Sequence, residues 1–163
     1  MKIIKIVAVI TLVLFTSCAK DKNDDNIQFL VGHWHVFDFQ ADPDSPIDDS
    51  LLAKEAIMKL NVVGCDPIEY TFGSDGEFFA KDGLRYVSVA AGEAGVEFGC
   101  PSQFDFGTGS FDFNNERLTL NYDEGNLELE GSMDGENLMI NVNNMVINGK
   151  QVSGKLLFMR QIN

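Results

Sequence analysis

Two histidines near the start of the chain have the types and spacing that come closest to a reactive site. His33 and His35 flank Trp34, and since alternate residues of a strand share a face, this is the arrangement of a two-histidine metal site. No third ligand accompanies them in the sequence, so we expect a solvated pair and no bound metal. The chain has 2 histidines in total. Without a nucleophile beside a positioned base, we predict a protein that is not an enzyme and uses no cofactor.

Acidic side chains outnumber basic ones by a wide margin. The 25 Asp and Glu residues against 12 Lys and Arg residues give a net charge of −13, and a field of this sign repels phosphate, so we expect no nucleic-acid partner. Paired carboxylates can hydrolyse glycosides, but among so many acids some pairs arise by chance, and we interpret them as a solvated exterior. The acidic segment 42–49 has Pro46 and Ile47 where a calcium-binding loop needs a ligand and a glycine, which favours an ordinary loop.

The first residues have the organisation of a secretory signal. Lysines lie within residues 1–5, and the mainly apolar stretch 6–15 is far shorter than the ~18–20 residues that a membrane-spanning helix needs. The small residues Thr16 and Ser17 then precede Cys18, and this sequence resembles the lipobox of bacterial lipoproteins. A plain secretory signal with an incidental Cys18 is the alternative interpretation.

The lipobox resemblance implies a lipid-anchored protein of the bacterial cell envelope. Residues 1–17 would be removed as a lipoprotein signal peptide, and acyl chains on Cys18 would bind the membrane with ~0.8 kcal/mol per buried CH₂. Residues 18–26 form a polar tether, which is either a spacer or, by resemblance, the acidic export signal of surface lipoproteins. We therefore expect an outer-membrane lipoprotein that is periplasmic or surface-exposed.

The two remaining cysteines, Cys65 and Cys100, form an even pair once Cys18 carries lipid. Thiols of exported proteins meet an oxidising compartment, so we predict a disulfide between them. A zinc site is the weaker interpretation because the sequence lacks the close ligand spacing that zinc requires.

Most of the chain from residue 27 onward alternates between apolar and polar residues, with turn signals every 8–12 residues. This pattern predicts an all-β fold, an antiparallel up-and-down barrel of about 8–10 strands. The first strand is expected at 33–39 and another at 84–90. The one short helix is predicted at 51–60, capped by a residue within 48–50, where it could cover one end of the barrel.

The turn at 74–76 contains Asp-Gly, a strong hairpin signal. Read as a three-residue loop, it predicts that Phe72 lies opposite Phe78 and Tyr70 opposite Ala80.

Two further expectations concern the strand 103–113. Phe104 and Phe106 fall on even positions and Phe111 and Phe113 on odd ones, so a bulge at the intervening glycines is expected to keep all four rings inside. A turn at 114–115 is then expected to pair Phe111 with Leu118.

The segment Leu30-Val31-Gly32-His33-Trp34 looks like the Gly-x-Trp entry of the lipocalins. Together with the order of the later cysteine and glycine-aromatic motifs, it makes residues 27–163 similar to the lipocalin-like domain of small bacterial lipoproteins. In lipocalins a late-strand arginine stacks over that tryptophan, and the resemblance therefore implies a barrel plug made by Trp34 and Arg160.

An eight-stranded barrel can either enclose one small ligand or fill itself with side chains. Our first hypothesis is a barrel that binds a small apolar or amphipathic ligand in its mouth. The expected lining comprises Trp34, Tyr70, Phe72, Phe78, Phe104 and Phe106. The alternative is a filled barrel that serves as a non-catalytic interaction or scaffold module, with a protein partner that the sequence does not identify.

Overall fold

The computed structural model describes residues 27–93, 95–124 and 127–161. The predicted signal peptide, Cys18 and the tether 18–26 lie outside these residues. The strands are β1 (Gly32–Ala41), β2 (Ile68–Phe72), β3 (Glu77–Asp82), β4 (Ser88–Gly92), β5 (Gly95–Gly99), β6 (Asp105–Asn114), β7 (Arg117–Tyr122), β8 (Glu128–Asp134), β9 (Asn137–Ile147) and β10 (Lys150–Arg160). They are accompanied by the helix α2 (Ile47–Val62) and the 3-10 helix η1 (Leu84–Tyr86). In the described part of the chain, no helix has the length and apolar character needed to cross a bilayer.

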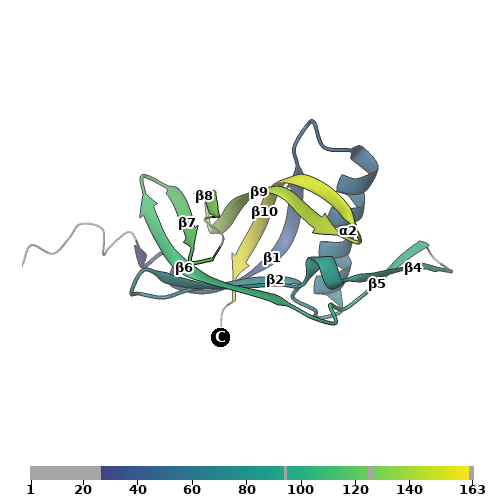
Figure 1. Cartoon of the computed structure of the whole chain (residues 1–163), viewed down its shortest axis with the longest axis horizontal. Coiled ribbons are helices and arrows are strands. Elements are labelled where there is room, and N and C mark those ends of the chain that lie inside the picture. The colour runs from purple at the N-terminus through teal and green to yellow at the C-terminus, as the bar shows by residue number, and fades with distance from the viewer. Residues whose placement is uncertain (1–26, 94, 125–126, 162–163) are drawn as a thin grey trace, which may run out of the picture.

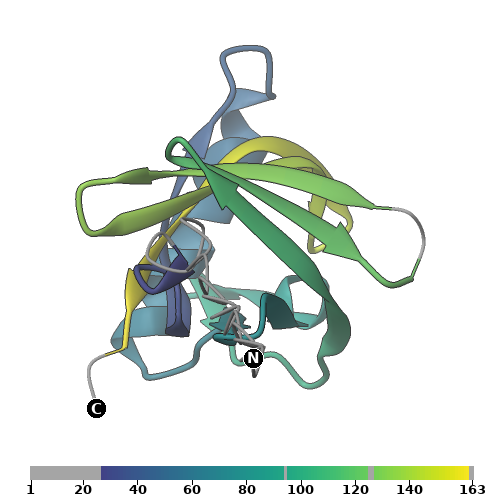
Figure 2. The same cartoon turned by 90° about the vertical axis from the view of Figure 1, so that its left-hand side faces the viewer.

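Eight of the strands close into an antiparallel barrel in the order β1-β10-β9-β8-β7-β6-β3-β2 (Figure 1). The view turned by 90° shows these strands curving into a ring (Figure 2). The predicted all-β barrel with one short helix is therefore confirmed. In the hairpin of β2 and β3, Phe72 pairs with Phe78 and Tyr70 with Ala80, as the Asp-Gly turn predicts.

The helix α2 begins at Ile47, four residues before the predicted start at 51. Pro46 holds the N-cap position without a side-chain cap, and Asp48 and Asp49 lie in the first turn, where their charges favour the helix dipole. The acids that we expected to cap the helix are thus inside it. The buried face comprises Ala53, Ala56, Ile57 and Leu60, and the helix packs against β1 and β10.

The predicted strand 84–90 is wrong in its first part, because residues 84–86 form η1, whereas residues 88–90 belong to β4. Leu84 and Val87 are both buried, and this spacing of three suits the single turn of η1, which directly follows β3. The chain then leaves the barrel as the separate two-stranded sheet of β4 and β5, and β3 pairs directly with β6 (Figure 1).

The predicted bulge in β6 is also wrong. The pairing of β6 with β3 and with β7 runs without a register shift, so its odd positions face inward throughout. Phe106 therefore points outward with 65% of its surface exposed, and its ring stacks on that of Phe79 at 5.7 Å. Gly107 and Gly109 are inward spacers, because an added Cβ would lie 2.7 Å from the Tyr122 ring and 2.1 Å from the Asn121 carbonyl oxygen, respectively.

One part of the barrel interior is filled by aromatic rings. Phe72 contacts Phe111 edge to face at 5.0 Å between centroids, and Tyr70 contacts Phe158 in the same way at 5.3 Å. Both geometries are favourable for aromatic pairs. Phe72, Phe111 and Phe158 are buried, so a ligand site inside the barrel has to lie away from these three rings.

Candidate functional site

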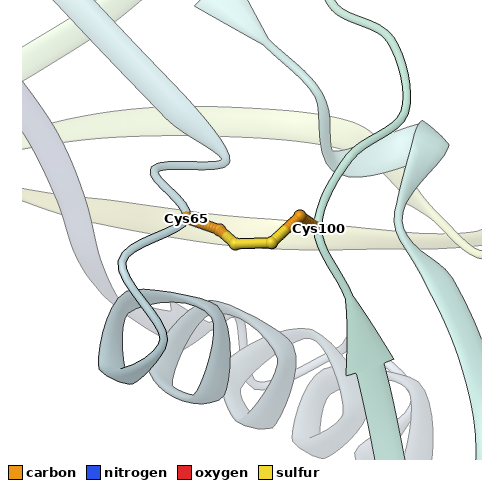
Figure 3. Close-up of a disulfide and its surroundings, with 2 residues drawn as sticks. All are labelled: Cys65 and Cys100. Atoms are coloured by element: carbon orange, nitrogen blue, oxygen red, sulfur yellow. A yellow bond between two sulfur atoms is a disulfide. The ribbon is translucent and has the colours of Figure 1, made fainter.

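Cys65 and Cys100 form a disulfide with their Cα atoms 5.7 Å apart (Figure 3). Cys65 follows α2, and Cys100 follows β5. The bond therefore ties the helix to the segment that leads back from the β4–β5 hairpin into the barrel. This confirms the predicted cysteine pair.

Trp34 and Arg160 are cross-strand partners on β1 and β10. The Arg160 guanidinium carbon lies 5.1 Å from the centroid of the Trp34 ring, within cation–π range. The indole N–H of Trp34 donates to the Leu30 carbonyl at 2.7 Å, and the guanidinium of Arg160 donates to the Phe29 carbonyl. These contacts join the turn 27–30 to the barrel, and the Trp34–Arg160 contact that the resemblance implies is present.

A cavity of about 550 Å³ lies at the mouth of the barrel, where β3 ends and β6 begins. Pockets of roughly 300–1,000 Å³ are typical of small-molecule sites. Its apolar lining includes Ile68, Ala80, Leu129, Val142, Met145 and Leu156. Its polar lining includes Tyr70, Tyr122, Asp82, Arg85, Asp105 and Asn143. The site is therefore amphipathic.

A bulge in β9 helps to shape the rim. The pairing of β9 with β10 shifts between Val152 and Gly154, so that Asn143 and Asn144 together face Ser153. Asn144 adopts a φ of 58°, a conformation that asparagine tolerates better than most residues, and its N–H donates to the Ser153 hydroxyl at 3.1 Å. Bulges of this kind are common at barrel rims, where they redirect side chains.

Two tyrosines form the floor of the cavity. The hydroxyl oxygens of Tyr70 and Tyr122 lie 2.6 Å apart, while the Tyr122 ring packs edge-on against Phe78 at 4.8 Å. Burial raises the pKa of Tyr70 well above its ordinary value and also raises the pKa of Tyr122, so both hydroxyls stay protonated near neutral pH. One hydroxyl donates to the other, which leaves one proton of the pair free to donate elsewhere.

The acids of the rim have unequal environments. Asp82 and Asp105 are cross-strand partners on β3 and β6. The carboxylate of Asp105 accepts from the Nε atom of Arg85 at 2.8 Å and from the hydroxyl of Tyr86 at 2.9 Å. The carboxylate of Asp82 accepts from the backbone N–H of Leu84 at 2.9 Å.

The desolvation of Asp82 raises the pKa of its carboxyl above the ordinary value, and the charge of Asp105 raises it further. The Leu84 N–H and the charge of Arg85 act in the opposite direction. Asp82 is nevertheless exposed at the rim of the cavity, so solvent still reaches its carboxylate.

Of the six aromatic residues expected to line a ligand site, Tyr70 and Phe106 border the cavity. Trp34, Phe72 and Phe78 are buried in the filled part of the barrel. Phe104 lies beside β3, with the Lys81 ammonium 4.2 Å from its ring centroid.

Several lining residues escaped sequence analysis. Tyr122 continues the inward alternation of Leu118 and Leu120, and Asp105 lies on the inward, odd positions of β6. The alternation would have predicted both residues if the inward positions of each strand had been assigned correctly. Asp82 likewise continues the inward positions of Phe78 and Ala80 on β3. Arg85 lies in η1, where strand alternation gives no guidance.

The histidine pair lies on the outer face of β1. His33 is exposed, and its Nδ1 atom lies 2.9 Å from the Thr71 hydroxyl. Within residues 27–93, 95–124 and 127–161, no group of three or more His, Cys, Asp or Glu side chains is arranged to hold a metal ion.

No family model, curated protein or solved structure matches the chain.

Proposed function

We propose that the protein is a lipid-anchored envelope protein whose barrel binds a small amphipathic molecule at its mouth. The observation that supports this function is the cavity of about 550 Å³ with its apolar wall and polar rim. The filled-barrel alternative is disfavoured by the same observation, because a scaffold that binds partners only by its surface needs no internal space.

The small inward residues explain why the mouth is open while the rest of the barrel is filled. Ala80 and Gly107 are cross-strand partners, and both face the cavity. They occupy inward positions where large side chains would fill the lumen. Burying an apolar ligand chain here contributes about 0.8 kcal/mol per CH₂, so two additional carbons should tighten binding roughly tenfold until the cavity is full.

A cavity-blocking substitution tests ligand binding. Val142→Trp places a large ring in the cavity wall and is expected to weaken binding of 1-alkanols at least about tenfold, which corresponds to ~1.4 kcal/mol. The measurement is displacement of the neutral dye N-phenyl-1-naphthylamine by octan-1-ol, decan-1-ol and dodecan-1-ol. Val96→Trp is the matched control, because Val96 lies on β5 outside the cavity. An unaltered affinity in Val142→Trp, or no alkanol binding to the wild type, would contradict the proposal.

The anchor is tested at Cys18. Cys18→Ser is expected to move the protein from the membrane fraction to the soluble fraction, because the serine hydroxyl cannot receive the thioether-linked lipid that holds the chain to the bilayer. The measurement is cell fractionation with metabolic labelling by palmitate. Ser17→Ala keeps a small residue before Cys18 and should remain in the membrane fraction. Membrane-bound, unlabelled Cys18→Ser protein would refute lipid anchoring.

A further inference from the structure

We infer that the cavity at the barrel mouth selects amphipathic ligands that carry a protonated amine, with the Asp82 carboxylate as the counter-ion. This inference rests on the proposed function, since it specifies the chemical class of the ligand that the cavity takes. The argument follows from the charges at the rim and from the position of Asp82.

Both cations that line the cavity already have carboxylate partners. The guanidinium of Arg85 contacts Asp105 through Nε at 2.8 Å, and a second nitrogen donates to the same carboxylate at 2.9 Å. The ammonium of Lys81 lies 2.5 Å from the carboxylate of Glu69. In both pairs a carboxylate already offsets the positive charge, which weakens its attraction for an anionic ligand.

The carboxylate of Asp82, by contrast, has no cationic partner among the residues that the structure describes. Its hydrogen bond comes from the Leu84 backbone. The lining also includes Asp105 and Glu124, so the acids exceed the bases at the rim. A ligand ammonium would supply the positive charge that the protein does not provide to Asp82, and a charge-assisted hydrogen bond is among the stronger polar contacts.

The residues around Asp82 can also contact the alkyl chain of an amine ligand. Asp82 is the cross-strand partner of Ile68, whose side chain belongs to the apolar wall of the cavity. The Tyr70–Tyr122 pair lies deeper, with hydroxyl oxygens that can accept a hydrogen bond from the ligand. An alkyl chain in the cavity and an amine at the rim would therefore both have complementary contacts.

Anionic amphiphiles should bind least well. A carboxylate at the same position would face Asp82 and Asp105, and like charges brought together in a partly desolvated site repel. Its attraction to Arg85 would be weakened, because the carboxylate of Asp105 already offsets that charge. A neutral alcohol gains the apolar contacts without attraction or repulsion between full charges.

Three ligands with one chain length separate these contributions. The unacylated Cys18→Ser chain, purified without detergent, is titrated with decylamine, decan-1-ol and decanoate at neutral pH while displacement of N-phenyl-1-naphthylamine is followed. Decylamine is expected to bind about tenfold more tightly than decan-1-ol, as one charge-assisted hydrogen bond allows, and decanoate is expected to bind most weakly.

Asp82→Asn keeps the shape of the side chain and an acceptor for the Leu84 N–H while it removes the charge. The preference for decylamine over decan-1-ol should disappear in this variant. Asp82→Glu retains the charge and should retain the preference for decylamine. This variant tests the inference independently if Asp82→Asn fails to fold. The matched control is Asp112→Asn, because Asp112 lies exposed on β6 away from the cavity.

Equal binding of decylamine and decan-1-ol to the wild type would overturn the amine inference and leave the proposed function standing. An amine preference that survives in a folded Asp82→Asn protein would also overturn it. Failure of all three compounds to displace the dye would overturn both the inference and the proposed function.

Discussion

Trp34→Ala is expected to lower the free energy of unfolding by about 3–5 kcal/mol, the range typical of removing a large buried aromatic side chain. The Trp34 side chain is 2% exposed and belongs to the core. Its loss leaves a cavity, removes the hydrogen bond to the Leu30 carbonyl and takes away the ring beneath the Arg160 guanidinium. The turn 27–30 should then detach from this end of the barrel. Denaturant titration gives the free energy, and the melting temperature should fall by roughly 10 °C.

Two comparisons isolate the buried ring. Phe106→Ala removes an aromatic side chain that is 65% exposed and should alter stability by less than about 1 kcal/mol. Arg160→Ala keeps the Trp34 ring but removes its cation–π partner and the hydrogen bond to the Phe29 carbonyl, and it should cost about 0.5–2 kcal/mol. A melting temperature of Trp34→Ala within about 2 °C of the wild-type value is what a surface substitution would give. This result would show that the Trp34–Arg160 plug does not hold the barrel together.

Cys65→Ser is expected to lower the free energy of unfolding by about 3–4 kcal/mol in the chain-entropy estimate. The disulfide joins residues 35 positions apart, so without it the unfolded chain gains the freedom of a long loop. The bond also secures the end of α2 beside the return from the β4–β5 hairpin. The measurement is thermal and denaturant unfolding under oxidising conditions.

Reduction provides the control for this prediction. A wild-type protein treated with a strong thiol reductant should approach the stability of Cys65→Ser, and Cys65→Ser/Cys100→Ser should match either single variant. Thiol titration of the native, unreduced protein should find neither Cys65 nor Cys100 reactive. Two reactive thiols in the folded domain would show that the bond does not form in solution.

Local turn chemistry explains which parts of the fold the sequence predicted well. The Asp75-Gly76 turn fixes the register of β2 and β3, since Gly76 adopts a φ of 83° that favours glycine. The expected pairs of Tyr70 and Phe72 across this hairpin are confirmed. Here the alternation of the strands and the turn residues specify the same register.

The next turn shows how a register can be missed while the inward face is right. Asn115 and Glu116 both have positive φ, so they are the central residues of the turn, and Phe113 pairs with Leu118. The sequence predicted a turn at 114–115 and a pairing of Phe111 with Leu118, which is displaced by two residues. A displacement of two preserves the face of every side chain, so apolar alternation alone could not reveal the error.

The candidate site was harder to predict than the barrel that carries it. The cavity is lined by the ends of strands that are distant in sequence, as the pairing of Asp82 with Asp105 illustrates. Strand alternation places residues inside or outside the barrel but does not give their height along its axis. The aromatic residues were therefore expected at the mouth, whereas Phe72 and Phe78 fill the interior and small residues leave the mouth open.

The closed ring also determines where this protein is vulnerable to unwanted association. Each of the eight barrel strands has hydrogen-bonded neighbours on both sides, whereas β4 and β5 pair only with each other among the residues that the structure describes. Intermolecular strand addition, the first step of many aggregates, would find its template along the outer sides of this hairpin. Each of its strands is 5 residues long, which limits how many bonds a second molecule can form there. Storage conditions that loosen this hairpin are therefore the ones under which the protein should first lose solubility.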